Sequence, residues 1–143
     1  MLESKRFTSV IHDLEDDDEE LIAILNRLIK FMVNYVNNSE ELREEIRDYD
    51  DIFQIIVSDI NFNFWIRVSN GTIFYKRGIN RNASFKVIYT KKLFIKIIKR
   101  EKEGTDAYMR GKIKVDGNLT QALKFIKFFR FFMKYNQHRE RMR

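Results

Sequence analysis

The chain of 143 residues contains no cysteine and no proline, and it has only five glycines and two histidines. Without cysteine it can form no disulfide, no thiolate nucleophile and no zinc-cysteine cluster. We therefore expect a core held together by packing, which suits a reducing compartment. The histidines, His12 and His138, fall in expected end segments, so they do not indicate a catalytic pair.

Long apolar runs are also missing, although 44% of the residues are hydrophobic. No run approaches the roughly 20 apolar residues of a membrane-spanning helix, and the first twenty residues lack the apolar core of a signal peptide. We expect a cytoplasmic protein. A glycine-rich phosphate loop, a nucleophile elbow and paired carboxylates are missing too, so we expect no enzyme, no metal and no other cofactor.

Charge is divided unevenly along the chain. Residues 1–51 carry 6 Lys and Arg against 15 Asp and Glu, and residues 52–143 carry 21 against 6, so the two parts hold −9 and +15 and sum to +6. The two parts should attract each other. The net charge alone therefore does not indicate a polyanionic partner.

The N-terminal part predicts two helices. The acidic run 13–20 leads into an apolar stripe at helical spacing. The stripe consists of Leu21, Leu25, Leu28, Met32 and Tyr35. Ser39 is suited to cap a second, short helix that reaches about Tyr49. We interpret the acidic run as a solvated helix start because it lacks the spaced ligands and glycine of a calcium loop.

From Ile52 onward the apolar period changes to two, which predicts strands at 52–57, 62–69 and 85–89. Asn70-Gly71 is the strongest short hairpin signal because both central residues of a type I′ turn need positive φ. A two-residue loop there pairs Val68 with Ile73 and keeps one face apolar. Residues 91–100 fit a helix or a strand equally well.

The last third predicts a short strand at 112–115, an Asp-Gly break, and a long helix capped by Asn118. The apolar side chains of this helix cover an arc of roughly 200°, where one packing face needs only about 100°. The helix therefore has a second contact to make. The partner is a lipid, a membrane or a protein, unless its own domain buries the helix on two sides.

Three segments carry a resemblance to a known family: WIRVSNGTIFYKRG, SFKVIYT and GTDAYMRGKIKVDGNLTQALKF. Through them, residues 52–133 resemble the sterol carrier protein type 2 family. The resemblance implies an α+β fold, in which helices cover one mostly antiparallel five-stranded sheet and an apolar tunnel lies between them. It also implies that residues 91–100 form a helix.

On this reading the chain has three parts. Residues 1–51 form an acidic arm with helices that pack on the core, residues 52–135 form the sterol-carrier-like core, and residues 136–143 form a basic tail. The resemblance implies non-enzymatic binding or transfer of a sterol, isoprenoid or fatty acyl chain. Together with the wide apolar arc, it predicts lipid contact for Phe94, Ile98, Tyr108, Met109, Phe125, Phe128, Phe129 and Phe132.

The cationic side of the last helix predicts a transient contact with an anionic membrane surface, made by Lys124, Lys127, Arg130 and Lys134. Two other functions stay open. The same helix could serve a protein adaptor or subunit as its interface. A nucleic-acid-binding module is less favoured, and its residues are Trp65, Phe74 and Tyr75 with Arg67, Lys76 and Arg77.

Overall fold

The computed structural model describes residues 16–99, 110–111 and 113–141, with side chains described as far as Met133. The first fifteen residues of the expected acidic arm lie outside these residues, as do Tyr108 and Met109 of the predicted lipid contact.

The N-terminal helices begin at the residues that their caps predict. The Asp17 carboxylate accepts a hydrogen bond from the Glu20 amide at 3.1 Å, and α2 (Asp18–Asn37) follows. The Ser39 hydroxyl accepts from the Leu42 amide at 3.3 Å and caps α3 (Glu40–Glu45). The predicted pair of helices is confirmed, although α3 ends before Tyr49. These side chains satisfy first-turn amides that have no partner within the helix.

Five strands form one sheet in the order β3-β2-β1-β4-β5. They are β1 (Asp50–Val57), β2 (Phe62–Ser69), β3 (Thr72–Arg77), β4 (Phe85–Tyr89) and β5 (Lys114–Asp116). All neighbours are antiparallel except β1 and β4, which are parallel. A short 3₁₀ turn, η1 (Ser58–Ile60), joins β1 to β2. The predicted α+β fold with a mostly antiparallel sheet is confirmed.

The hairpin between β2 and β3 has the predicted register. Asn70 and Gly71 have φ of 53° and 71°, and Val68 pairs with Ile73. The turn therefore keeps the apolar side chains of both strands on one face of the sheet. The last predicted strand is shifted by comparison, because β5 begins at Lys114 and includes Asp116, which pairs with Lys86.

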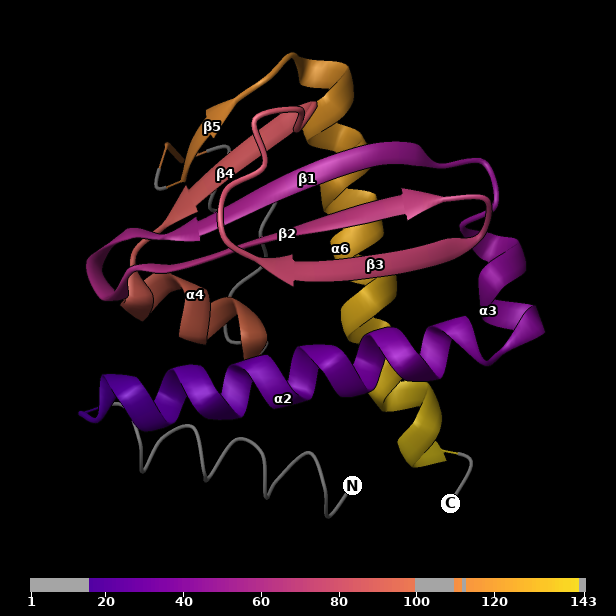
Figure 1. Cartoon of the computed structure of the whole chain (residues 1–143), viewed down its shortest axis with the longest axis horizontal. Helices are drawn as coiled ribbons and strands as arrows, with labels where there is room; N and C mark the ends of the chain where they lie inside the picture. The colour runs from indigo at the N-terminus through magenta and orange to yellow at the C-terminus, as the bar shows by residue number, and fades with distance from the viewer. Residues whose placement is uncertain (1–15, 100–109, 112, 142–143) are drawn as a thin grey trace.

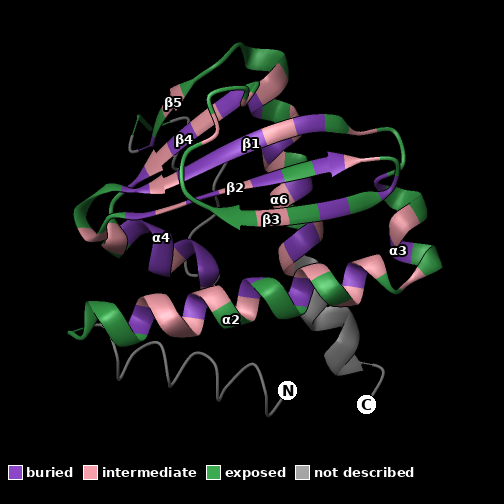
Figure 2. Cartoon of the chain, in the orientation of Figure 1, coloured by how far each residue is buried: buried purple, intermediate pink, exposed green. Residues whose placement is uncertain are grey.

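Three helices lie against the same face of the sheet, as Figures 1 and 2 show. From α2, Asn26 accepts a hydrogen bond from the Tyr75 hydroxyl at 2.7 Å. The second helix is α4 (Lys91–Ile98), and its Phe94 packs on Tyr89. The third is α6 (Leu119–Arg141), and its Phe125 packs on Phe53. The helix at 91–98 confirms the choice that the resemblance favoured. α2 contributes five buried side chains to the core, so it is as much a part of the core as the sheet.

The opposite face of the sheet is crossed by the connection between β3 and β4, which runs in front of β2 and β1 in Figure 1. Gln54 lies beneath this connection and is buried. Its side-chain amide donates to the Gly78 carbonyl at 3.0 Å, and its oxygen accepts from the Asn80 amide at 2.7 Å. The alternating pattern placed Gln54 on the exposed side of a half-buried strand. It is buried instead because a distant loop covers it.

Candidate functional site

The inner face of α6 is built from phenylalanines that pack on β1 and β4. Phe125 lies 5.3 Å from both the Phe53 and the Phe85 rings, and Phe128 lies 5.7 Å from Phe53. Phe128 also stacks on Phe132 at 5.8 Å. The helix begins at the position set by Asn118, whose side chain accepts from the Gln121 amide at 2.8 Å. This face of α6 forms one wall of an apolar interior.

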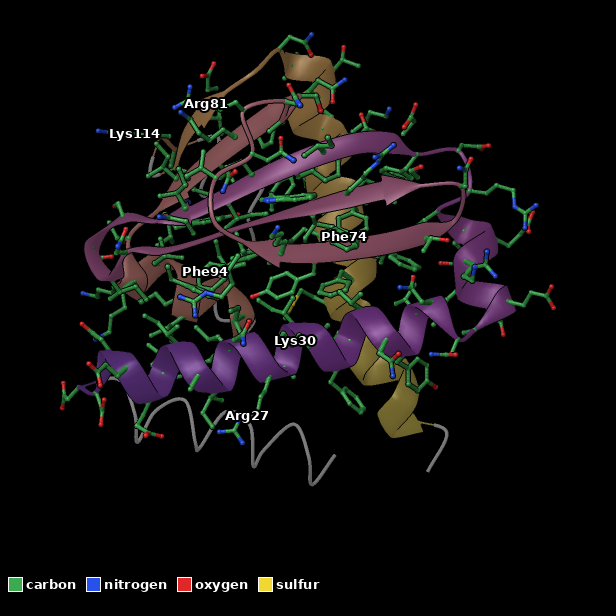
Figure 3. All side chains as sticks on the ribbon, viewed as in Figure 1. Arg27, Lys30, Phe74, Arg81, Phe94 and Lys114 are labelled. Atoms are coloured by element: carbon green, nitrogen blue, oxygen red, sulfur yellow. The ribbon has the colours of Figure 1, made fainter. Side chains whose placement is uncertain are left out.

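The second wall is the apolar side of α4. Its Leu93, Phe94, Ile95, Ile97 and Ile98 are all buried, and most of the helix is purple in Figure 2. Lys92 is exposed and Lys91 and Lys96 are half-buried, so α4 is an amphipathic helix whose apolar residues are covered by other elements. Phe94 lies where α4 meets the sheet (Figure 3) and packs 5.3 Å from the Tyr89 ring.

The structure thus places the predicted lipid-contacting residues as follows. Phe94, Ile98, Phe125, Phe128 and Phe132 are buried, and Phe129 is half-buried beside Phe125 at 5.7 Å. Tyr108 and Met109 lie outside the described residues. All the described members lie on helices that cover one face of the sheet. Those of α6 form one ring cluster, and Phe94 pairs instead with Tyr89 on β4. An apolar tunnel between these walls stays a prediction.

The outer face of α6 carries exposed leucines beside cations. Leu119 and Leu123 are 61% and 54% exposed. At about 100° per residue, Lys127 and Arg130 project on the same side of the helix as these leucines. Both cations are exposed. The second apolar face expected for this helix is therefore a narrow stripe, bordered by positive charge.

Lys124 has a different environment from the other predicted membrane-contacting residues. Its ammonium lies 2.9 Å from Oδ2 of Asp51, a carboxylate that is 5% exposed, and 5.8 Å from the centre of the Tyr49 ring. This ion pair joins α6 to the start of β1. Lys134 belongs to α6, but its side chain lies outside the described residues.

Burial affects the phenols on the helix-covered face of the sheet. Burial raises the pKa of Tyr75 to about 12, an effect that the Arg77 cation opposes. Burial likewise raises the pKa of Tyr89. At neutral pH both phenols are therefore protonated and can donate a hydrogen bond. Tyr89 is not among the residues that the sequence predicts for the site. Its signal was a tyrosine at a buried position of an apolar strand, where a hydroxyl needs a partner.

The residues of the nucleic-acid hypothesis are divided between the two faces of the sheet. Trp65 and Phe74 lie 5.4 Å apart on the face away from the helices, where Phe74 is labelled in Figure 3. Tyr75 points the other way and bonds to Asn26 on α2. The stacking surface is therefore smaller than the sequence suggested.

None of the helices in the described part of the chain is long and apolar enough to cross a bilayer. Within that part there is also no cluster of three or more acidic, histidine or cysteine side chains arranged around a metal position.

A five-stranded, mostly antiparallel sheet with helices on one face places the chain among small α+β domains, a fold that does not by itself define a function. The sequence profile of the SCP-2 sterol transfer family matches residues 15–130. The chain belongs to this family. The match begins before α2, so the N-terminal helices are included in the family domain. No curated protein matches the chain at a significant level.

Solved structures of sterol carrier proteins have the same fold as this chain. A crystal structure of sterol carrier protein 2 superposes with a TM-score of 0.60 at 15% identity, over 75% of this chain and 91% of that one. The apo form of sterol carrier protein 2 from Yarrowia lipolytica gives 0.58 at 16% identity, over 78% and 88%.

An enzyme also contains the fold. The sec-alkylsulfatase Pisa1 from Pseudomonas sp. superposes with a TM-score of 0.51 at 21% identity, over 59% of this chain. This chain spans 14% of the length of that enzyme. At such identities the likeness shows the fold alone, so an activity of the larger protein does not transfer to this chain.

Proposed function

We propose that the protein is a non-enzymatic lipid carrier, which holds a sterol, an isoprenoid or a fatty acyl chain between the sheet and the two helices α4 and α6. The observation that carries the proposal is the aromatic inner face of α6, together with the buried apolar side chains of α4, in a chain of the SCP-2 sterol transfer family. Aromatic and aliphatic walls suit an apolar ligand because burial in them removes its surface from water.

The apolar surface that such a site buries sets its expected affinity for a lipid. Burying about 200 Å² of alkyl surface at ~25 cal/mol per Å² offers roughly 5 kcal/mol before ordering costs. This energy corresponds to a Kd of about 0.2 mM, so binding is reversible, and micromolar affinity requires that more surface is covered. Weak, reversible binding suits a carrier that loads and unloads.

The outer stripe of α6 is the proposed membrane contact. Leu119 and Leu123 supply apolar side chains of suitable exposure, and Lys127 with Arg130 and Lys134 would meet anionic head groups. Lys124 contributes less to this surface than its sequence position indicated, since its ammonium is bound by Asp51. Each cation near such a surface contributes about 1 kcal/mol.

Transfer of a pyrene-labelled acyl lipid between vesicles tests the proposal. We expect transfer to rise when the acceptor vesicles contain phosphatidylserine, and to fall in the variant Leu123→Asp/Lys127→Glu. A matched control changes the opposite side of the molecule with Phe74→Asp/Lys76→Glu, which should leave transfer unchanged. Absence of both lipid binding and transfer in a folded protein, together with a stoichiometric protein complex through α6, would establish the adaptor alternative instead.

A further inference from the structure

The face of the sheet opposite the helices carries an excess of positive charge. Successive side chains of a strand point to opposite faces, so the residues that alternate with the helix-facing ones project here. The connection between β3 and β4 crosses the same face and adds one arginine (Figures 1 and 3). All of these cations are exposed except Lys86, which is half-buried. We call this set the cationic face, and it consists of Arg67, Lys76, Arg81, Lys86 and Lys114.

Negative charge does not balance the cationic face. Asp50 and Asp116 are the acidic residues of the described strands that point to it, at the start of β1 and the end of β5. No ion pair in the described part of the chain involves a residue of the cationic face, and those between the acidic and the basic part lie on the helix-covered side. Because Asp116 lies opposite Lys86 in the ladder, the uncompensated charge belongs to the other four cations.

Two aromatic rings lie among these cations, on β2 and β3. Phe74 is 54% exposed, and its ring centre lies 5.4 Å from that of Trp65, which is half-buried. Phe74 pairs with Arg67 across the two strands, and Trp65 pairs with Lys76. Rings and cations therefore alternate over four neighbouring positions. Trp65 supports the Phe74 ring from within the sheet, and the exposed part of Phe74 lies between two cations.

We propose that the cationic face binds a single-stranded nucleic acid, with Phe74 stacked on a base and Arg67 and Lys76 at the adjoining phosphates. Arg81 and Lys114 would continue the phosphate contacts toward β5. Single strands are bound by cations that follow the backbone together with aromatic rings on which bases stack. An acidic peptide needs the cations and has no use for the ring, so the exposed Phe74 between two cations favours a nucleic acid.

The face suits single strands of any sequence. Gln54 is the polar side chain beneath the connection, and its amide group is occupied by the Gly78 carbonyl and the Asn80 amide. It is therefore not in a position to read the edge of a base, whereas charge and stacking carry little sequence information. The inference adds a second function to the lipid carrier and does not depend on it, because the two surfaces lie on opposite sides of the sheet.

Fluorescence anisotropy with a fluorescein-labelled, twelve-residue oligothymidylate and the full chain tests the inference. Four phosphate contacts predict that the logarithm of the binding constant falls with the logarithm of the salt concentration at a slope of about −3, which is a loss of about fiftyfold between 50 and 200 mM. An abasic oligonucleotide of the same length and backbone should bind about tenfold more weakly, since it offers no base to Phe74. Trp65 is the only tryptophan of the chain, and its emission should be quenched by the oligothymidylate.

Variants of β3 separate stacking from charge. Phe74→Ala should lower the affinity for oligothymidylate about tenfold to that of the abasic probe without changing the salt slope, and Phe74→Tyr should keep the affinity. Lys76→Gln should reduce the slope by about 0.7. Arg77→Gln is its matched control, because it removes the same charge from the next residue, whose guanidinium lies 5.4 Å from the centre of the Phe62 ring on the other face. This control should keep the slope.

Each outcome decides for or against the nucleic-acid site. No binding of oligothymidylate at 50 mM salt overturns it, as does equal binding of the abasic probe or full affinity in a folded Phe74→Ala protein. Tighter binding of a twelve-residue polyglutamate than of oligothymidylate at equal salt would identify an acidic protein segment as the partner instead. Vesicle transfer of the pyrene-labelled lipid should be unchanged in Phe74→Ala, so failure of this site leaves the lipid carrier standing.

Discussion

Asp51 and Gln54 are polar side chains buried on opposite faces of β1, and each joins the strand to a distant part of the chain. Asp51 faces the helices and bonds to Lys124 of α6. Gln54 faces the other way and holds the loop that crosses the sheet, through Gly78 and Asn80. Both side chains are satisfied, as buried polar groups must be if the fold is to be stable.

The Asp51–Lys124 ion pair predicts a measurable coupling. Lys124→Met leaves a buried carboxylate without its cation, and because the lysine is 40% exposed we expect the free energy of unfolding to fall by about 2 kcal/mol rather than the larger loss of a fully buried pair. Urea unfolding measures this loss. The double variant Asp51→Asn/Lys124→Met should recover most of it. A single variant as stable as the wild type would show that the ion pair does not hold α6.

Tyr75 predicts a loss of stability at high pH. Its phenol has a pKa of about 12 in the folded protein, against an ordinary value of 10.0. Above pH 10 the unfolded chain releases this proton and the folded chain retains it, so the unfolded state gains and the free energy of unfolding falls as pH rises toward 12. In Tyr75→Phe this part of the decline should disappear from denaturant curves. Equal slopes in both proteins would contradict the assignment, since the lysines titrate alike in the two.

The α6 helix has two apolar faces, one that packs on the sheet and one that remains exposed. Phe125 and Phe128 pack on the sheet, and Leu119 and Leu123 remain exposed on the outside. The wide apolar arc in the sequence indicated both faces, because it exceeded what one contact needs. The arc did not indicate which cation of α6 would form an ion pair with a buried carboxylate. That choice depends on Asp51, which lies 73 residues away from Lys124 in sequence.

The β2–β3 hairpin provides a prediction at the same scale. A Cβ at Gly71 would lie 3.0 Å from the Arg43 carbonyl oxygen, whereas a Cβ at Gly111, with nearly the same φ, would meet nothing within 4 Å. Both alanine variants strain the backbone, and only Gly71→Ala also disturbs the contact between the hairpin and α3. We expect Gly71→Ala to cost about 1 to 2 kcal/mol more than Gly111→Ala in thermal or urea unfolding. Equal losses of stability in the two variants would mean that α3 moves away from the added methyl group at no measurable cost.

The elements were predictable where their signals are local. Asn70-Gly71 fixed the hairpin register, Ser39 and Asn118 marked helix starts, and period-two alternation marked three strands. Residues 91–98 needed the family resemblance because their apolar pattern fits either structure. The burial of Gln54 could not be predicted from the sequence, since it depends on the distant loop that lies over it.

On the scale of the whole molecule, α2 joins the acidic part of the chain to the rest through packing more than through charge. Its Leu21, Leu25, Ile29, Met32 and Val36 are 0–7% exposed. Asn37 at its end accepts from and donates to the backbone of Ile73, at 2.8 Å and 2.7 Å, and so covers part of the β3 edge. The opposite charges of the two parts of the chain would also allow the acidic helices to act as a movable lid held by charge alone. The burial of α2 argues for a fixed part of the core.

Deletion of residues 1–38 should therefore unfold the protein and not merely open it. Five buried aliphatic side chains at about 2 kcal/mol each amount to roughly 10 kcal/mol, which is comparable to the whole stability of a domain. Circular dichroism should show no cooperative thermal transition in the truncated chain. A truncated chain that melts cooperatively and still exchanges lipid would identify α2 as a dispensable cover.

The central claim is that the interior between the sheet, α4 and α6 holds a lipid. Native mass spectrometry of the full chain, purified without detergent and followed by solvent extraction, tests it most directly. The account predicts about one lipid per chain, with an apolar body. A ligand-free chain that also fails to take up pyrene-labelled decanol would contradict it, and the aromatic face of α6 would then be core alone.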